Sequence, residues 1–284
     1  MAFFSALRLQ ALGLITLLIS SVLIAGCAST TQPGAVGVER KQFLLISSEQ
    51  ANQGAATFYA EEKSKYARTG ALNQNPQQTA RVREIASRLI EQAGAFRPDT
   101  RNWQWEVNVI NSKEINAYCA AGGKIAVYSG LIDTLHLTDA EIAAVMGHEI
   151  SHALREHTRE AMSEAMAEQV GLTVLAIAFK LDQNSASLLG NAATVGLTLP
   201  FSREKEREAD RIGMELMARA GYDPHAAISV WQKMLSSGSA RPPQILSTHP
   251  DPENRIQDIE AHLPYVMPLY EDAKKKMSGK KEAG

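Results

Sequence analysis

The chain has 284 residues, of which 45% are hydrophobic and 21% are charged, and its formal net charge is −2. This composition is typical of a soluble globular protein and excludes a fibrous or mainly disordered chain. Because the sequence has neither a basic stripe nor a long acidic block, we expect no nucleic-acid partner.

The first 26 residues are typical of an export signal. Arg8 is the only charge ahead of an apolar run from Ala11 to Ile24, and small residues follow the run. The run holds about 14 residues, whereas a membrane-spanning helix needs roughly 20. We therefore predict a signal peptide over residues 1–26 rather than a transmembrane anchor.

The segment Leu23-Ile24-Ala25-Gly26-Cys27 resembles the lipobox of bacterial lipoproteins. This resemblance implies that the Cys27 thiol carries a diacylglyceryl group and that Cys27 becomes the new N-terminus. Ala28 follows where inner-membrane retention uses Asp, so the resemblance further implies an outer-membrane lipoprotein that faces the periplasm. Residues 27–42 are small and polar and would form the lipidated tether.

The main domain is predicted over residues 43–272, followed by a disordered tail over 273–284. The apolar spacing predicts two amphipathic helices and then three strands of a small antiparallel sheet, over 47–66, 79–95, 103–110, 115–119 and 124–128. Helix start signals then occur at Thr138 with Glu141, at Ser202, and at two Asp-Pro pairs. The fold class is therefore α+β, mainly α.

The sequence His148-Glu149-Ile150-Ser151-His152 lies within the helix that Thr138 caps. Histidines at positions i and i+4 stand on one helix face, so both rings can bind one metal ion. Glu149 lies about 100° around the helix, close enough to hold a water molecule beside the metal. The alternative, a pair of core histidines without a metal, is disfavoured by this pattern. His157 points nearly opposite His148 on this helix, and we predict that it is structural or exposed.

A catalytic zinc site needs three protein ligands and one open position, so a third ligand must come from elsewhere. In the helix after Ser202, Glu206 shares a face with apolar residues, and a carboxylate on such a face is costly unless it is paired or binds metal. We predict Glu206 as the third ligand. Asp210, one turn later, is placed to accept the remaining N–H of a ligand histidine. A second stripe is predicted to face solvent: Glu204, Glu208, Arg211 and Glu215.

Four motifs in order now resemble one family. Glu206-x-x-Ala-Asp210 after the H-E-x-x-H motif is similar to the zinc metallopeptidases of the CAAX prenyl endopeptidase and HtpX type. Asn116-Ala117-Tyr118 with the segment 122–128, and Ser247-Thr248-His249-Pro250 with Arg255-Ile256, are similar to the same family. In architecture the chain most resembles its LoiP-like and BepA-like periplasmic lipoprotein peptidases. The resemblance implies a zincin-like domain whose sheet packs on the active-site helix, with one Zn²⁺ per chain.

The resemblance implies hydrolysis of peptide bonds in unfolded or misfolded envelope proteins, with zinc and Glu149 activating water. We expect an extended substrate to pair with the strand formed by Lys124, Ile125, Ala126, Val127 and Tyr128, with Asn116 nearby. Three roles remain open for His249: oxyanion stabiliser, plug of the open zinc position, or structural residue. The apolar stretch 171–199 predicts a helical hairpin over the active-site groove.

A second hypothesis belongs to a different class of protein. The chain could be a chaperone or an outer-membrane assembly factor in which zinc is structural or permanently plugged. An intact Glu149 argues against this hypothesis, because a structural zinc site needs no general base.

Overall fold

A computed structural model of the chain describes residues 27–178, 200–237, 243–250 and 252–282. The predicted signal peptide and most of the predicted hairpin over 171–199 lie outside these residues. The strands are β1 (Cys27–Ala28), β2 (Gln42–Phe43), β3 (Glu106–Ile110), β4 (Ala117–Ala120) and β5 (Lys124–Tyr128). The helices of the first half are α2 (Ser48–Arg68), α3 (Pro76–Ala93), the short 3-10 helix η1 (Pro98–Asn102), α4 (Ser129–Leu135) and α5 (Asp139–Leu154). The later helices are α6 (His157–Ala178), α9 (Arg203–Arg219), α10 (Ala226–Ser236), α11 (Gln244–Thr248) and α12 (Pro252–Glu282).

Strands β3, β4 and β5 form a mixed sheet in the order β3-β5-β4. β5 runs antiparallel to β4 but parallel to β3, so the expectation of an antiparallel sheet is wrong for one of the two pairs. The turn at Gly122 and Gly123, which have φ of 76° and 83°, joins β4 to β5. After this turn β5 lies between β4 and β3 and pairs with both. Glycine adopts this left-handed backbone without steric cost.

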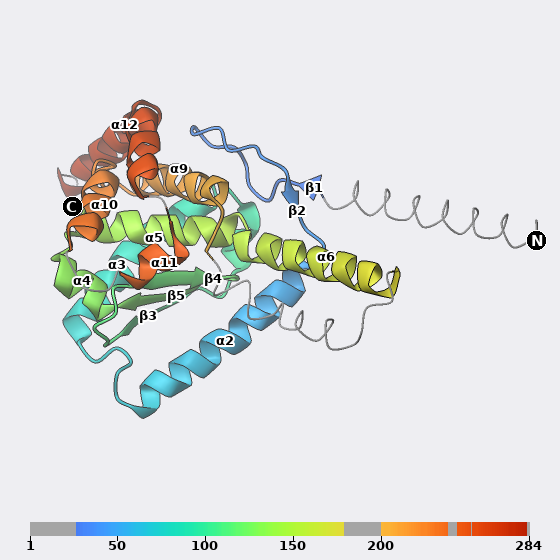
Figure 1. Cartoon of the computed structure of the whole chain (residues 1–284). Coiled ribbons are helices and arrows are strands. Elements are labelled where there is room, and N and C mark those ends of the chain that lie inside the picture. Colours follow the sequence, from blue (N-terminus) through green and yellow to red (C-terminus); the bar gives the residue numbers. More distant parts are fainter. Residues whose placement is uncertain (1–26, 179–199, 238–242, 251, 283–284) are drawn as a thin grey trace, which may run out of the picture.

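Helices cover both faces of this sheet (Figure 1). On one face α3 and α5 bury alternate strand residues, among them Val109, Cys119 and Val127, in the main core. On the other face α2 packs on Ala126 and Tyr128 through Tyr59. The predicted α+β class, mainly α and with a small sheet packed on the helix that carries the H-E-x-x-H motif, is confirmed.

Helix α5 is buried from Glu141 to Leu154 and lies at the centre of the domain. Its start is the predicted capping box, in which Thr138 and Glu141 each accept a hydrogen bond from the other's backbone N–H. Helix α9 crosses α5 where Gly147 faces Gly213. A Cβ atom on Gly213 would lie 2.8 Å from the backbone nitrogen of His148, so only glycine permits this close crossing.

The N-terminal segment 27–43, here called the strap, packs on the domain, where the sequence predicts a lipidated tether over residues 27–42. β1 pairs with β2, and the side chains of Val36 and Val38 are buried. The buried carboxylate of Glu215 accepts hydrogen bonds from the backbone N–H groups of Ala35 and Val36, at 2.7 and 3.2 Å. These apolar and backbone contacts explain why a small, polar sequence is nevertheless held in place.

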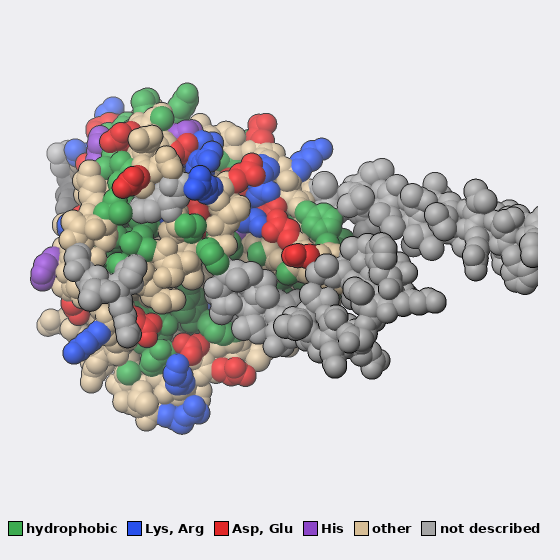
Figure 2. Space-filling view, in the orientation of Figure 1, with side chains coloured by type: hydrophobic (Ala, Val, Ile, Leu, Met, Phe, Trp, Pro, Cys, Tyr) green, Lys and Arg blue, Asp and Glu red, His purple; other side chains and the backbone are tan. Residues whose placement is uncertain are grey.

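The predicted disordered tail also differs from the structure, because residues 273–282 continue α12. Met277 lies 3.4 Å from the Arg88 guanidinium, which ties this end of the helix to α3. No helix in the described part of the chain is both long enough and apolar enough to cross a bilayer. On the face shown in Figure 2, acidic and basic side chains are interspersed rather than gathered by sign.

Candidate metal centre

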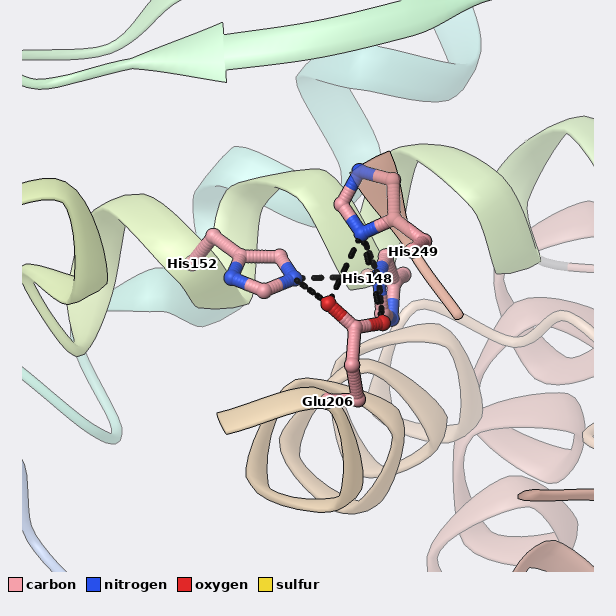
Figure 3. Close-up of side chains that lie close together, drawn as sticks. All are labelled: His148, His152, Glu206 and His249. Atoms are coloured by element: carbon pink, nitrogen blue, oxygen red, sulfur yellow. Dashed lines mark hydrogen bonds and ion pairs between the residues drawn. The ribbon is translucent and has the colours of Figure 1, made fainter. Parts of the chain in front are cut away.

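Four donor side chains from three elements meet in the interior of the domain (Figure 3). His148 and His152 come from α5, Glu206 comes from the first turn of α9, and His249 follows the last residue of α11. Each offers one ligand atom, and these four atoms all lie within 4.8 Å of one another. The structure therefore brings together the two histidines and the glutamate that the sequence predicts as metal ligands.

The spacing of the donor atoms suits one small ion. Nε2 of His148 lies 3.0 Å from Nε2 of His152 and 3.5 Å from Oε2 of Glu206, and Nε2 of His152 lies 3.6 Å from Oε1 of Glu206. Two donors at tetrahedral positions around zinc, each about 2.0–2.1 Å from the ion, lie roughly 3.3 Å apart. Imidazole nitrogens with one carboxylate oxygen are a donor set that zinc prefers. The residues present therefore fit zinc.

The protonation states of these ligands also suit a metal. Burial lowers the pKa of His152 well below its usual value, and the neighbouring His148 lowers it further, so the ring is neutral. Burial alone would raise the pKa of Glu206, but the charges of His249 and Arg255 outweigh it and lower the pKa. Neutral imidazole and ionised carboxylate are the forms that bind metal.

His249 occupies the fourth corner of this group. Its Nδ1 lies 3.0 Å from Oε1 of Glu206 and 3.2 Å from Nε2 of His148. Its other ring nitrogen, Nε2, lies 3.6 Å from Oε1 of Glu149. Of the three roles that the sequence leaves open, this position suits a plug, because the corner is the one that a catalytic site keeps open.

Asp210 supports His148 as the sequence predicts. Its Oδ1 lies 3.0 Å from Nδ1 of His148, on the side of the ring away from the other donors. The Arg255 guanidinium donates to both oxygens of Asp210 and stacks on the Trp231 ring at 3.8 Å. Although burial alone would raise the pKa of Asp210, Arg255 and His148 lower it to about 2. This carboxylate therefore stays charged and holds Nδ1 of His148 protonated, which leaves Nε2 for the metal.

His157 supports His152, and the prediction of a structural or exposed histidine on the far side of the helix missed this contact. α5 ends at Leu154, and Glu156 has φ of 51°, so the chain turns sharply before α6 begins. This turn returns the buried His157 ring to the ligand, with 2.9 Å between the Nδ1 atoms of His157 and His152. Phe201 stacks on the face of the His152 ring, with 4.2 Å between the two ring centres.

The charged stripe predicted to face solvent is wrong for two of its members. Glu208 is 5% exposed and Glu215 is fully buried. Periodicity places both on a different side of α9 from Glu206, but the strap covers that side. Nothing in the periodicity of α9 alone could show that a segment from the other end of the chain would pack there.

The predicted substrate strand is also corrected. Both edges of β5, Lys124–Tyr128, are already paired, with β3 on one side and β4 on the other, so its backbone cannot receive a substrate. β4 is one of the two edge strands of this sheet among the described residues, the other being β3. β4 lines a cavity of about 220 Å³ together with Asn116, Glu149, His152 and His249. Asn116, which the prediction grouped with the substrate strand, directly precedes β4 and lines this cavity.

Comparison with known proteins gives matches over most of the domain. The family model "Peptidase family M48" matches residues 76–263. The chain is 38% identical to the mitochondrial metalloendopeptidase OMA1 of Arabidopsis thaliana over 53% of its length, and 33% identical to that of Schizosaccharomyces pombe over 79%. It is 30% identical to the beta-barrel assembly-enhancing protease of Escherichia coli over 70% of its length.

These alignments cover only 30%, 64% and 41% of the three relatives' own lengths. The matched residues 76–263 nevertheless hold all four donor side chains, together with Glu149 and Asp210. The sheet, the crossed helices α5 and α9 and the zinc-type donor set all lie inside that match. The chain therefore belongs to peptidase family M48.

Proposed function

We propose that this chain is a zinc endopeptidase that hydrolyses peptide bonds of unfolded polypeptides. One observation carries the proposal: Glu149 is 4% exposed, lines the cavity beside the four donors, and its Oε1 has no hydrogen-bond partner among the residues that the structure describes. A buried carboxylate oxygen without a partner is costly, so such atoms concentrate where chemistry uses them. A structural zinc site has no use for a buried carboxylate such as Glu149, because it needs no general base.

The chain's own residues account for the proton transfers. When bound, zinc would polarise a water molecule and the scissile carbonyl group. Burial raises the pKa of Glu149, while His249 and His148 partly oppose this rise, so the carboxylate is a stronger base than an exposed glutamate. Glu149 then takes a proton from water and delivers it to the leaving amine.

The cavity suits an extended chain. β4 lines it and is an edge strand of the sheet in the described part of the chain, and added strands are held mainly through backbone hydrogen bonds, which do not read sequence. The aromatic rings of Phe58, Tyr118 and Phe201 line the same cavity and favour apolar side chains. We infer that the substrates are unfolded or misfolded envelope proteins, an inference that the name of the Escherichia coli relative supports.

The test compares cleavage of an unfolded protein by the wild type and by Glu149→Gln. We expect the variant to lose about 10²–10⁴-fold in rate, because a positioned general base contributes that much, while it still binds zinc. A chelator should silence the wild type and added zinc should restore it. Glu91→Gln is the control, since that side chain is exposed on helix α3. Undiminished cleavage by Glu149→Gln would refute the mechanism.

We further propose that Cys27 carries lipid and anchors the protein in the outer membrane, facing the periplasm. The lipobox-like sequence ahead of Cys27 supports this location. Cys27→Ser should abolish incorporation of labelled fatty acid and move the protein to the soluble periplasmic fraction. Fatty-acid labelling of the Cys27→Ser protein would contradict the assignment.

The position of His249 favours a second candidate, a chaperone or assembly factor whose zinc site is plugged or structural. The two readings differ in the outcome of His249→Ala. If His249 plugs a catalytic site, the variant keeps zinc and cleaves at least as fast as the wild type. If His249 is a fourth structural ligand, the variant loses zinc. Full rescue of a deletion strain by Glu149→Gln would also favour the non-enzymatic function.

A further inference from the structure

The distal nitrogen of His152 begins a chain of buried contacts. Nδ1 of His152 lies 2.9 Å from Nδ1 of His157, and Nε2 of His157 lies 3.0 Å from Oε2 of Glu208. If Nε2 of His152 binds the metal, its Nδ1–H donates to His157, and Nε2–H of His157 donates to Glu208. One arrangement of protons therefore satisfies both contacts and fixes the orientation of the ligand ring.

Glu208 is itself held by the strap. Nε of Arg40 lies 2.8 Å from Oε1 of Glu208, and the same guanidinium donates at 2.6 and 2.9 Å to the two oxygens of Glu160 on α6. Arg155, which is fully buried, also donates to Glu208 at 3.1 Å. Although burial alone would raise the pKa of Glu208, its bonds with His157 and Arg40 lower it to about 2.

Arg155 depends on the strap as well. Its guanidinium donates to the Ser29 and Thr31 hydroxyls and to the Arg40 carbonyl, at 3.1, 3.2 and 2.9 Å. The side-chain amide of Gln42, another strap residue and fully buried, donates to the Arg155 carbonyl and to the Glu160 carboxylate. The strap therefore supplies most of the partners that keep Glu208 and its two arginines in one arrangement.

We propose that the strap is part of the metal centre: Arg40 is a positioning residue that sets zinc affinity through Glu208, His157 and His152. The inference rests on the proposed zinc site. Partners behind a ligand histidine matter because they hold the ring in the orientation that binds, and their loss typically costs 10–100-fold in metal affinity. Loss of Arg40 removes the guanidinium group whose two hydrogen bonds to Glu208 hold this carboxylate beside His157.

The experiment measures the zinc dissociation constant of the full chain by competition with a chromogenic chelator. We expect Arg40→Ala and Glu208→Gln each to raise this constant by about 10–100-fold. Arg40→Lys keeps the charge but lacks the planar fork, so it should fall between Arg40→Ala and the wild type. The double variant should be little worse than either single one, because both changes break the same chain of contacts.

Glu215→Gln is the matched control. Glu215 is the other buried glutamate of α9 that binds the strap, but its partners are Ala35, Val36 and Arg219 and it does not contact His157. This variant alters contacts of the strap at Ala35 and Val36 but leaves Arg40 and its bonds to Glu208 in place, so its zinc dissociation constant should stay within about twofold of the wild type. Circular dichroism of each zinc-free variant confirms that it is folded.

Cobalt(II) substitution provides a second readout. The visible absorption of bound cobalt reports ligand geometry, so its bands should shift in Arg40→Ala and stay unchanged in Glu215→Gln. The inference would be overturned if folded Arg40→Ala and Glu208→Gln kept wild-type zinc affinity and unshifted cobalt bands. If Arg40→Ala does not fold, Arg40→Lys replaces it in both measurements. Absence of zinc binding by the wild type would instead overturn the proposed function.

Discussion

The two ligand histidines of α5 are supported by the same chemistry in two different constructions. His148 donates directly to Asp210, whose partner Arg255 lies in α12 within the domain core. His152 reaches its carboxylate, Glu208, only through a second imidazole, and the arginine behind it comes from the strap. We call Asp210 with Arg255 the Asp210 arm, and His157 with Glu208 and Arg40 the strap arm. In each arm a charged arginine keeps a buried carboxylate ionised, and the carboxylate fixes the tautomer of a ligand histidine.

The two arginines differ in burial, and burial decides which carboxylate tolerates loss of its partner. Arg255 is 2% exposed and fully surrounded by protein, whereas the side chain of Arg40 is 23% exposed. An ion that loses its partner in the core has no water to replace it, while an ion near the surface can be solvated. The Asp210 arm should therefore be the rigid one, and the strap arm the adjustable one.

The largest effect is expected for Asp210→Asn. The change leaves the buried Arg255 charge with Glu206 as its remaining anionic partner, 2.7 Å away. Breaking a buried ion pair costs about 3–5 kcal/mol, and we expect the lower end of that range because Glu206 remains. Urea unfolding of the zinc-free protein measures the loss.

Glu208→Gln provides the comparison within the same experiment. It should lower the free energy of unfolding by about half as much, since water can reach Arg40 and Arg155 keeps its bonds to the strap. A larger loss in Glu208→Gln than in Asp210→Asn would reverse the ranking of the two arms.

The Asp210 arm was predictable from the sequence and the strap arm was not. Glu206 and Asp210 lie one turn apart on a single helix, so helical periodicity alone places both on the face toward α5. His157 was missed because that reasoning extended α5 past Leu154, whereas the left-handed Glu156 ends it. Glu208 and Arg40 are 168 residues apart, and no local pattern reports a contact of that separation.

The same distinction holds for the fold. The caps at Thr138 and Ser202 are local, and the structure confirms both. The direction of β5 relative to β3 depends on where the chain returns after Gly123, which is a tertiary outcome. The assignment of β5 as the substrate edge failed for that reason, because an edge is defined by neighbours rather than by a strand's own residues.

A smaller effect, shared by both arms, is expected for Gly213→Ala. The new Cβ would meet the backbone of Gly147 and His148 at 2.8–3.1 Å, so α9 must move away from α5. Overpacking of this kind costs about 1–3 kcal/mol, and the displacement carries Glu206 away from both histidines. Zinc affinity should fall together with stability. Ala218→Gly, in the same helix, is the control, because it creates space instead of a clash. Unchanged zinc affinity in a folded Gly213→Ala protein would show that the helix crossing does not set the ligand geometry.

The smallest effect is the acid sensitivity that Glu208 adds to the strap arm. Its pKa is about 2 in the folded protein and near 4.5 in the unfolded chain, so the unfolded state binds the proton first as pH falls. The stabilisation is complete above pH 4.5 and is lost as pH falls toward 2. We expect a contribution of about 1 kcal/mol, reduced from the full shift because Arg40 is partly solvated. Unfolding of the zinc-free wild type and Glu208→Gln should therefore differ at pH 6, and the difference should be smaller at pH 3 and close to zero near pH 2. A difference that stays constant over this range would mean that Glu208 is not held as an ion by His157 and Arg40, and the strap would then stabilise the site by packing alone.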